Sequence, residues 1–444
     1  MKAFKHTTVL AFLLLLTSCD QFLDVQPKAS ISDQQTIVDK ASSETALNGA
    51  YDSFRSYYSV NLQSIGYLSG DNIQWTGSQS QVQEFINHRV NAENPTVSSV
   101  WTGIYSMLNR ANHVLDKVPA VQDPSLSEAQ RNKIIGEAYF LRAFAYFDLA
   151  RIWGGAPIIT KPTLTPQDNR GIARSSQEEV YAQALADLNA AEPLLAETTD
   201  RFRATRKTVW ALKSRFYLYQ KDYVKAAEYA DKIIADAGNY QLVKPYNAFF
   251  ANDARGTTES VFEIFYNINE TNSHRGQWQP QEKGGTRQWA PNDAFVALAN
   301  DPKVGGNRSA LVAKDNQGRW YGNLYYRSPA TDPTFVIRIA ELYLIRAEAR
   351  AQTGNLTGAL ADLNAVRERA GIAKLTATNK AALLLAIENE RRIEFALEPD
   401  RWFDLVRTGR ATQVLNITDE SKLLLPVPAE QLLIDKALKQ NPGY

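Results

Sequence analysis

Cysteine and histidine are scarce in this 444-residue sequence, which contains one cysteine, Cys19, and four histidines. A single cysteine excludes a framework of disulfide bonds within the chain, because such frameworks need cysteines in pairs. The histidines show no i, i+4 pair and no spacing typical of zinc ligands, so the sequence predicts no metal site. Neither positive nor negative residues are in marked excess, and the net charge of +1 argues against a nucleic-acid partner.

Motifs of the common catalytic chemistries are also missing. The sequence has no Gly-x-Ser-x-Gly elbow, and the glycine pairs at 284–285 and 305–306 lack the context of a phosphate- or dinucleotide-binding loop. Glu388, Glu390 and Glu394 are the candidate acid–base carboxylates, but arginines interleave with them at i+3 and i+4, which favours intrahelical ion pairs. We therefore expect a protein that is not an enzyme and needs no cofactor.

Long hydrophobic runs are absent after the first twenty residues, so nothing later in the chain predicts a membrane-spanning segment. At the start, Lys2 and Lys5 precede an apolar run at 9–16 that is too short to cross a bilayer, and Cys19 follows shortly. This order is typical of a secretory signal, and Leu16-Thr17-Ser18-Cys19 resembles the bacterial lipobox. We expect residues 1–18 to be removed, Cys19 to carry lipid, and residues 19–33 to form a tether.

Helical periodicity is present over much of the remaining chain. Apolar residues recur at helical spacing in four early stretches, at 42–57, 100–118, 127–152 and 175–195. Good capping residues begin the last of these stretches, at Ser175-Ser176, and glycines follow the third. The sequence therefore predicts a mainly α protein.

Two later stretches, 207–238 and 339–371, resemble each other. When Ser214 is aligned with Ala347, each stretch has an aromatic residue four positions earlier and a small residue twelve positions later. The small residues are Ala226 in the first stretch and Ala359 in the second. This layout predicts two tetratricopeptide-like units, each a pair of antiparallel helices that buries its apolar face by stacking on its neighbours. Two generic helical hairpins are the alternative.

Two irregular insertions, 58–99 and 239–333, interrupt the helical pattern, and the second contains a β-like piece at 261–266. Each insertion carries tryptophan beside polar residues, and a tryptophan or tyrosine ring combines an apolar face with a polar edge, which suits sugar recognition. We expect Trp75 to converge with at least one other of these tryptophans on one shallow exposed ligand-binding face. The predicted ligand-binding residues are Asp71, Asn72, Trp75, Trp278, Arg287, Trp289, Trp320 and Tyr321.

Four stretches, taken in order, carry a resemblance to a known family. They are EAYFLRA at 137–143 with WGGAP at 153–157, then VIRIAELYLIRAEA at 336–349, then ERRIEF at 390–395 with DRWFDLVR at 400–407, and finally LPVP at 425–428 with QNPGY at 440–444. Together with the lipobox, they resemble the SusD/RagB family of outer-membrane nutrient-binding lipoproteins. The resemblance covers nearly all of the mature chain.

The resemblance implies one body built from an N-terminal helical region at 34–238, an irregular ligand face at 239–333, and a C-terminal helical region at 334–444. It implies a lipid-anchored protein on the bacterial cell surface that captures glycans for a TonB-dependent outer-membrane transporter, while other proteins cut the polymer. Peptide capture by the same architecture is the alternative, because the family motifs lie in the helical scaffold and do not identify the ligand. A surface hydrolase would need two carboxylates that converge from distant loops, and a pure assembly scaffold would bind only proteins.

Overall fold

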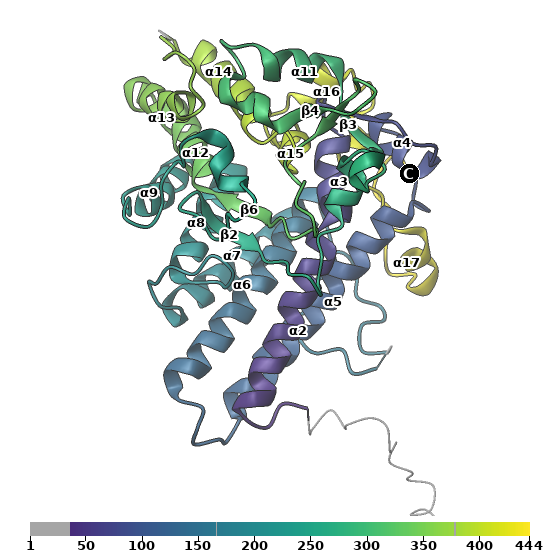
Figure 1. The fold of residues 1–444 in the computed structure, drawn as a ribbon. Helices are drawn as coiled ribbons and strands as arrows, with labels where there is room; N and C mark the ends of the chain where they lie inside the picture. The colour runs from purple at the N-terminus through teal and green to yellow at the C-terminus, as the bar shows by residue number, and fades with distance from the viewer. Residues whose placement is uncertain (1–35, 166, 377–378) are drawn as a thin grey trace, which may run out of the picture.

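The computed structural model describes residues 36–165, 167–376 and 379–444 (Figure 1). Cys19 and the predicted signal and tether lie outside these residues. The mainly α fold that the sequence predicts is confirmed, because helices make up most of the described chain. Among the described residues, no helix combines the length and apolar character that a membrane crossing requires.

Four long helices form the lower part of the molecule in Figure 1, where α2, α5, α6 and α7 pack side by side in chain order and α2 also contacts α6. Their bounds are α2 Lys40–Tyr58, α5 Pro95–Lys117, α6 Glu128–Trp153 and α7 Gln177–Leu194. All four lie where the sequence predicts helices. Helix α6 begins at a capping box between Ser127 and Gln130 and is buried without a break from Phe140 to its end, so it is the central helix of this layer.

Two helical hairpins follow, at the two places where the sequence predicts them. They comprise α8 Arg206–Tyr219 with α9 Tyr223–Ile234, and α12 Ile339–Gln352 with α13 Leu356–Arg369. Helix α9 packs against α12, so the hairpins stack on each other (Figure 1). Ala226 and Ala359 are fully buried, and Ser214 donates a hydrogen bond to the carbonyl of Ala226 at 2.9 Å. Small residues therefore permit close helix contact in both hairpins.

The first insertion, 58–99, is less irregular than its sequence suggests, because helix α3, Val60–Leu68, lies within it. Every residue of α3 from Leu62 onward is buried, so its apolar and small residues surround the helix and leave no polar face. A short helix α4, Ser80–Ile86, follows after strand β1, Ile73–Trp75. The expectation of an irregular segment fails here because a helix that is buried on all sides has no amphipathic period.

The second insertion, 239–333, joins three small antiparallel sheets to the helices. Strand β1 pairs with β3, β2 pairs with β6, and β4 pairs with β5. The strands are β2 Ser260–Ile264, β3 Trp289–Pro291, β4 Val312–Lys314, β5 Trp320–Gly322 and β6 Thr334–Arg338. Every residue of β2 and β6 is buried, and β6 leads directly into α12. The β-like piece that the sequence predicts at 261–266 is therefore confirmed by β2.

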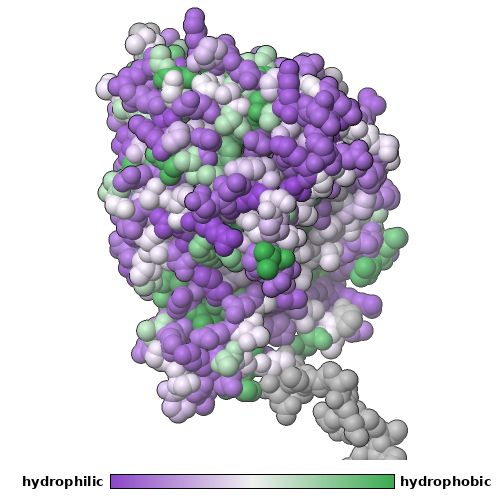
Figure 2. Space-filling view, viewed as in Figure 1, coloured by the Kyte–Doolittle hydropathy of each residue, from purple (hydrophilic) through white to green (hydrophobic). Residues whose placement is uncertain are grey.

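The remaining helices complete the upper part of the molecule in Figure 1 and its right-hand edge. They are α10 His274–Trp278, α11 Asp293–Asn300, α14 Lys380–Glu394, α15 Asp400–Arg407, α16 Ala411–Leu415 and α17 Ala429–Ile434. Short 3-10 turns lie at Val118–Ala120, Tyr246–Phe250, Gln281–Lys283, Gly306–Leu311 and Glu420–Leu423. The surface is largely hydrophilic, and Figure 2 shows a small hydrophobic patch at the right edge, over α17, where Leu433 and Ile434 are exposed.

The hairpin packing predicts a clear difference between two alanines of α13. Ala359 is fully buried, so Ala359→Leu should lower the free energy of unfolding by about 1–3 kcal/mol through overpacking. Ala361 is exposed on the same helix, so Ala361→Leu should change the free energy of unfolding by less than about 0.5 kcal/mol. Denaturant unfolding followed by circular dichroism measures both. Equal stability of the two variants would contradict a close helix crossing at Ala359.

Candidate functional site

The two insertions meet through strands β1 and β3. Their antiparallel register places Ile73 opposite Pro291, Gln74 opposite Ala290 and Trp75 opposite Trp289. The backbone amide of Thr76 donates to the carbonyl of Gln288 at 2.9 Å, which extends the pairing past the strand end. Segments more than two hundred residues apart in the sequence therefore form one surface region.

Trp75 ends β1 and is half-buried at the edge of a shallow hollow of about 400 Å³. The other lining residues come from the loop after β1 and from α4 and its C-terminal end, namely Gly77, Ser78, Gln79, Ser80, Gln83, Glu84, Asn87 and Arg89. A Cβ atom on Gly77 would lie 2.2 Å from Cζ2 of Trp75. The loop backbone at Gly77 therefore lies directly against the indole and fixes its position, and only glycine fits there.

The rim of this hollow is rich in amide groups. Gln79, Asn87 and Arg89 are exposed, and Gln83 donates from Nε2 to Oδ1 of Asn87 at 3.1 Å. Glu84 is held in place by Asn91 and Asn94, whose side-chain amides each donate a hydrogen bond to its carboxylate at 2.8 Å. An aromatic ring beside amides and one guanidinium offers both an apolar face and an edge of hydrogen-bonding groups. None of these rim residues is among the predicted ligand-binding residues, although the amide-rich stretch at 79–89 directly after Trp75 is a visible signal.

Trp320 and Arg287 lie in the same neighbourhood. Arg287 donates from Nε to the carbonyl of Trp320 at 2.8 Å, and its own carbonyl accepts a hydrogen bond from the hydroxyl of Thr76. The φ of Arg287 is +49°, a left-handed conformation that a non-glycine residue adopts only when its surroundings hold it. Trp320 is half-buried, with Nζ of Lys314 4.9 Å from its ring centroid. Arg287 thus links the residue after Trp75 to Trp320.

Three of the predicted ligand-binding residues are instead core residues, which corrects the sequence-based prediction for them. Trp278 and Tyr321 are 0% and 1% exposed, and Trp289 is 4% exposed. The two indole rings lie 5.8 Å apart, and each lies 5.2 Å from the ring of Tyr67 on α3. A buried ring has no free face for a ligand, so Trp278, Trp289 and Tyr321 form the base beneath the surface. Their sequence neighbours are as polar as those of Trp75, so composition alone did not separate them.

Asp71 and Asn72 attach the loop before β1 to the C-terminal helices. Asn72 is 1% exposed, donates to the carbonyl of Arg392 at 3.0 Å and accepts from Nε of Arg392 at 2.8 Å. Asp71 accepts from Nε and Nη2 of Arg401 at 2.7 and 3.0 Å and pairs with Arg392 at 3.2 Å. Burial acts to raise the pKa of Asp71, but the hydrogen bonds and charge of Arg401, with Arg392, outweigh it and lower the pKa. The prediction that Asn72 contacts ligand is therefore wrong, and both carboxylate oxygens of Asp71 are engaged by arginine.

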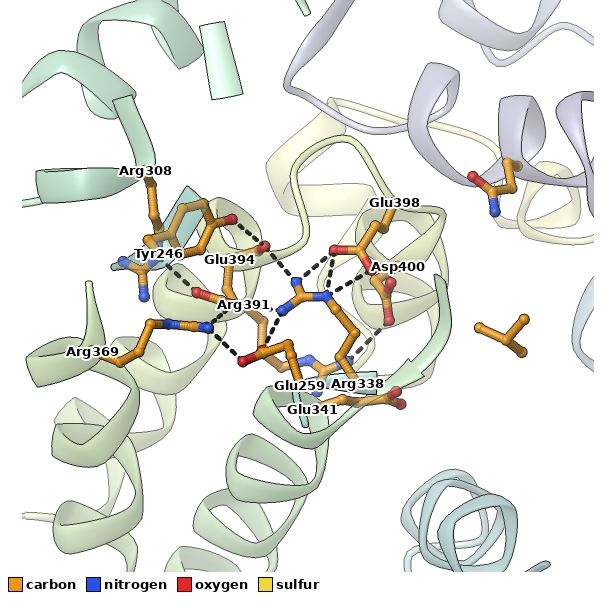
Figure 3. A network of polar contacts seen from close by, with 12 residues as sticks. Tyr246, Glu259, Arg308, Arg338, Glu341, Arg369, Arg391, Glu394, Glu398 and Asp400 are labelled. Carbon is orange, nitrogen blue, oxygen red and sulfur yellow. Dashed lines mark hydrogen bonds and ion pairs between the residues drawn. The ribbon is translucent and has the colours of Figure 1, made fainter. Parts of the chain in front are cut away.

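The candidate acid–base carboxylates of α14 are engaged by arginines as well. Glu394 pairs with Arg308 at 2.7 Å, with Arg338 at 2.8 Å, and with Arg369 (Figure 3). Glu390 pairs with Arg308 and Arg367, and Glu388 pairs with Arg401 and Arg410. The predicted structural role is confirmed for these carboxylates. Their partners, however, lie on other segments and not on the same helix, which corrects the expectation of intrahelical pairs.

Arg338 lies at the centre of this network and is fully buried. It pairs with Glu259 at 2.9 Å, with Glu394 at 2.8 Å and with Glu398 at 2.6 Å, while Arg369 pairs with Glu259 at 2.8 Å (Figure 3). Burial acts to raise the pKa of Glu394, but Arg369, Arg308 and Arg338 lower it to about 2. A carboxylate that stays ionised down to this pH cannot serve as a general acid near neutrality.

Two models of known protein families match this chain. A model of the SusD family matches residues 197–422, and a model described as "Starch-binding associating with outer membrane" matches residues 21–218. The chain belongs to the SusD family. The resemblance seen in the sequence motifs is thereby confirmed.

Individual SusD-family relatives extend over most or all of the chain. A SusD-like protein of Formosa agariphila is 28% identical, and the alignment covers 100% of both chains. The starch-binding protein SusD of Bacteroides thetaiotaomicron is 24% identical over 73% of this chain and 75% of that protein.

Solved structures agree with the fold. A SusD superfamily protein from Bacteroides vulgatus aligns with a TM-score of 0.83 at 21% identity, covering 91% of this chain and 99% of that one. A structure named "Laminarin binding SusD-like protein" aligns with a TM-score of 0.82 at 26% identity, covering 92% of this chain and 100% of that one.

The buried network of this SusD-family protein predicts how its stability depends on Glu394. Glu394→Gln should lower the free energy of unfolding by about 3–5 kcal/mol, because it leaves buried guanidinium groups without their counter-charge. The folded-state pKa of about 2 lies below the ordinary value of 4.5, so this contribution is complete above pH 4.5 and is lost as the pH falls toward 2. The difference between wild type and variant should therefore shrink over that interval in denaturant titrations.

Glu368→Gln is the matched control for this experiment. Glu368 lies on the surface of α13 and pairs with Lys374 at 3.0 Å, so its replacement should cost less than about 1 kcal/mol. If Glu394→Gln were as stable as Glu368→Gln at neutral pH, the assignment of Glu394 to a stabilising buried network would be wrong.

Proposed function

We propose that this SusD-family protein binds a glycan at the hollow beside Trp75 without cleaving it, and that it delivers the glycan to a TonB-dependent outer-membrane transporter. The observation that carries the proposal is an accessible indole, held in place by Gly77 and rimmed by amides. A pyranose stacks its C–H face on such a ring and directs its hydroxyl groups to the surrounding amides. The starch-binding description of the matching family model supports the same ligand class.

Binding without hydrolysis is supported by the lining of the hollow. Glu84 is the only carboxylate among the described residues that line it, and a glycosidase of the usual kind needs two carboxyl groups on either side of the scissile bond. Both carboxylate oxygens of Glu84 already accept hydrogen bonds from Asn91 and Asn94. The hollow therefore suits recognition of a sugar and lacks a second group for acid–base chemistry.

A glycan is better supported than the peptide that the sequence left open. Peptide binders commonly add the peptide as a strand to a sheet edge or pair its termini with charged groups. The rim beside Trp75 contains one carboxylate, already engaged, and one arginine, Arg89, and its other polar side chains are amides and hydroxyls. Neutral groups of this kind match the hydroxyls of a sugar.

The cellular setting of the proposal follows from the N-terminal sequence and the family. Cys19, in the lipobox-like sequence, would carry the lipid that holds the protein on the outer membrane, at the cell surface, beside its transporter. The affinity of this surface for a glycan should be modest, because a stacked ring contributes only on the order of 1 kcal/mol. Modest affinity suits a protein that passes its ligand on.

Replacement of Trp75 tests the ligand site. Trp75→Ala should weaken binding to laminarin or starch oligosaccharides about fivefold or more, which corresponds to about 1 kcal/mol, because the stacking face is lost. Gly77→Val retains the Trp75 side chain but pushes its indole out of position, so it should weaken binding by a similar factor. Isothermal titration with each oligosaccharide measures both variants, and neither should shift the melting temperature by more than a few degrees.

Two further variants serve as controls. Trp210 on α8 is half-buried and does not line the hollow, so Trp210→Ala should leave glycan affinity unchanged. Trp278→Ala should lower stability by about 3–5 kcal/mol because it empties a buried site. Undiminished glycan binding by Trp75→Ala and Gly77→Val would refute the hollow as the ligand site.

Replacement of Cys19 tests the anchor. Cys19→Ala removes the proposed lipid attachment point, so the protein should move from the outer-membrane fraction to the soluble fraction after cell lysis. Immunoblots of the two fractions measure the distribution, and Ser18→Ala, one residue earlier, should stay with the membrane. Retention of Cys19→Ala in the outer-membrane fraction would show that another contact holds the protein there.

A further inference from the structure

A second hollow of about 420 Å³ lies between α2, β2 and the loop near residue 202. Its lining residues are Asn48, Tyr51, Asp52, Phe54, Arg55, Phe202, Arg203, Phe262, Glu263, Ile264, Phe265 and Glu270. None of these residues lines the hollow beside Trp75. The two hollows are therefore built from separate parts of the chain.

Aromatic side chains form the wall and the floor of the second hollow. Phe265, the residue after β2, is 39% exposed, and its ring meets that of Phe202 edge to face at 5.6 Å. Beneath them, the buried rings of Phe54 and Phe262 stack at 5.8 Å. An accessible ring on a packed aromatic floor is a rigid apolar platform on which the C–H face of a sugar can stack.

Polar side chains surround this platform and hold one another in place. Arg203 donates to Asn48 and to the buried Glu137, each at 2.7 Å, and its guanidinium lies 4.0 Å from the ring centroid of Tyr51. Arg55 pairs with both Asp52 and Glu270, whose side chains are 56% and 52% exposed. The rim therefore presents fixed donors and acceptors before any ligand arrives, which lowers the entropy cost of binding.

Each arginine of the rim already has a carboxylate partner. Arg203 pairs with the buried Glu137, and Arg55 is shared between Asp52 and Glu270. Glu263 is buried, and burial raises the pKa of its carboxyl group. A rim whose charges are already paired favours a neutral ligand with many hydroxyl groups over an anionic or cationic one.

A peptide strand fits this hollow less well than a sugar. Strand β2 pairs with β6 on one edge, and on its other edge the amide of Glu263 already donates to the carbonyl of Arg201 at 2.8 Å. An added peptide strand would need that edge free. The available recognition elements are the ring of Phe265 and the polar rim.

We propose that this hollow is a second carbohydrate-binding site, which takes a neutral sugar unit on the ring of Phe265 with Asn48 and Asp52 as hydroxyl partners. The proposal rests on the proposed function, because it concerns the same class of ligand. With two sites on one chain, a polysaccharide can occupy both at once, and the second contact then forms at a high effective concentration. A short oligosaccharide occupies each site separately and gains nothing from the pair.

The experiment uses the full-length protein, laminarin as the polymer and a β-1,3-linked glucose hexasaccharide as the short probe. Phe265→Ala and Asn48→Ala should each weaken retention in laminarin-containing native gels roughly tenfold through the loss of the second contact. Quenching of tryptophan fluorescence by the hexasaccharide, which reports the Trp75 site, should stay unchanged in both variants. The double variant Trp75→Ala/Phe265→Ala should show no retention.

Ile268→Ala is the matched control, since Ile268 lies three residues beyond Phe265, is 72% exposed and does not line the hollow. It should be retained like the wild type. Wild-type retention of both Phe265→Ala and Asn48→Ala would overturn the second site and leave the proposed function intact. Absence of wild-type retention and of quenching would overturn both.

Discussion

The fold depends on a set of fully buried ion pairs centred on Arg338 and Glu394. These two side chains, with Glu259 and Arg369, come from β6, α14, the residue before β2 and α13, and none is exposed. A buried charge is tolerable only when its partners are in place, so the network is satisfied in one arrangement of these segments and costly in others. It therefore joins the stacked hairpins, the β2–β6 sheet and α14 into one unit with a defined geometry.

The proposed ligand surface is held rigid by the same helices. Asp71 and Asn72 are held by Arg392 at the end of α14 and by Arg401 on α15, so the loop that leads to Trp75 is fixed to the charged scaffold. On the other side, Trp278 and Trp289 pack on Tyr67 and support β3, the partner of β1. Only Trp75 and Trp320 among the four predicted tryptophans keep part of their rings accessible. An accessible ring on an immobile base binds a sugar without first having to be ordered.

Amphipathic helices were predictable from the sequence, and positions of single side chains in the insertions were not. Helices α2, α5 and α9 have one apolar face, which leaves a periodic signal. Helix α6 is buried all round from Phe140 onward, but its length and the glycines that follow it still indicate a helix. Helix α3 is buried all round and only nine residues long, so it leaves no comparable signal. Trp75 and Trp278 have similar polar neighbours in sequence, but Trp278 is covered because it packs on Tyr67 of α3, more than two hundred residues away in the chain. The partners of Glu394 were equally hidden, since a sequence shows its neighbours at i+3 and i+4 but not Arg308 or Arg338.

The pairing of β1 with β3 also has a consequence for the order in which the molecule is assembled. The hydrogen bond between Thr76 and Arg287 joins residues that are 211 positions apart. During synthesis, Trp75 emerges long before Arg287 follows it. Contacts between distant residues form slowly, because the intervening loop must close first. The helical layer of α2, α5, α6 and α7 has shorter connections and can pack during this interval. The proposed ligand surface is therefore completed after the helical layer, although the residue that carries its indole is made early.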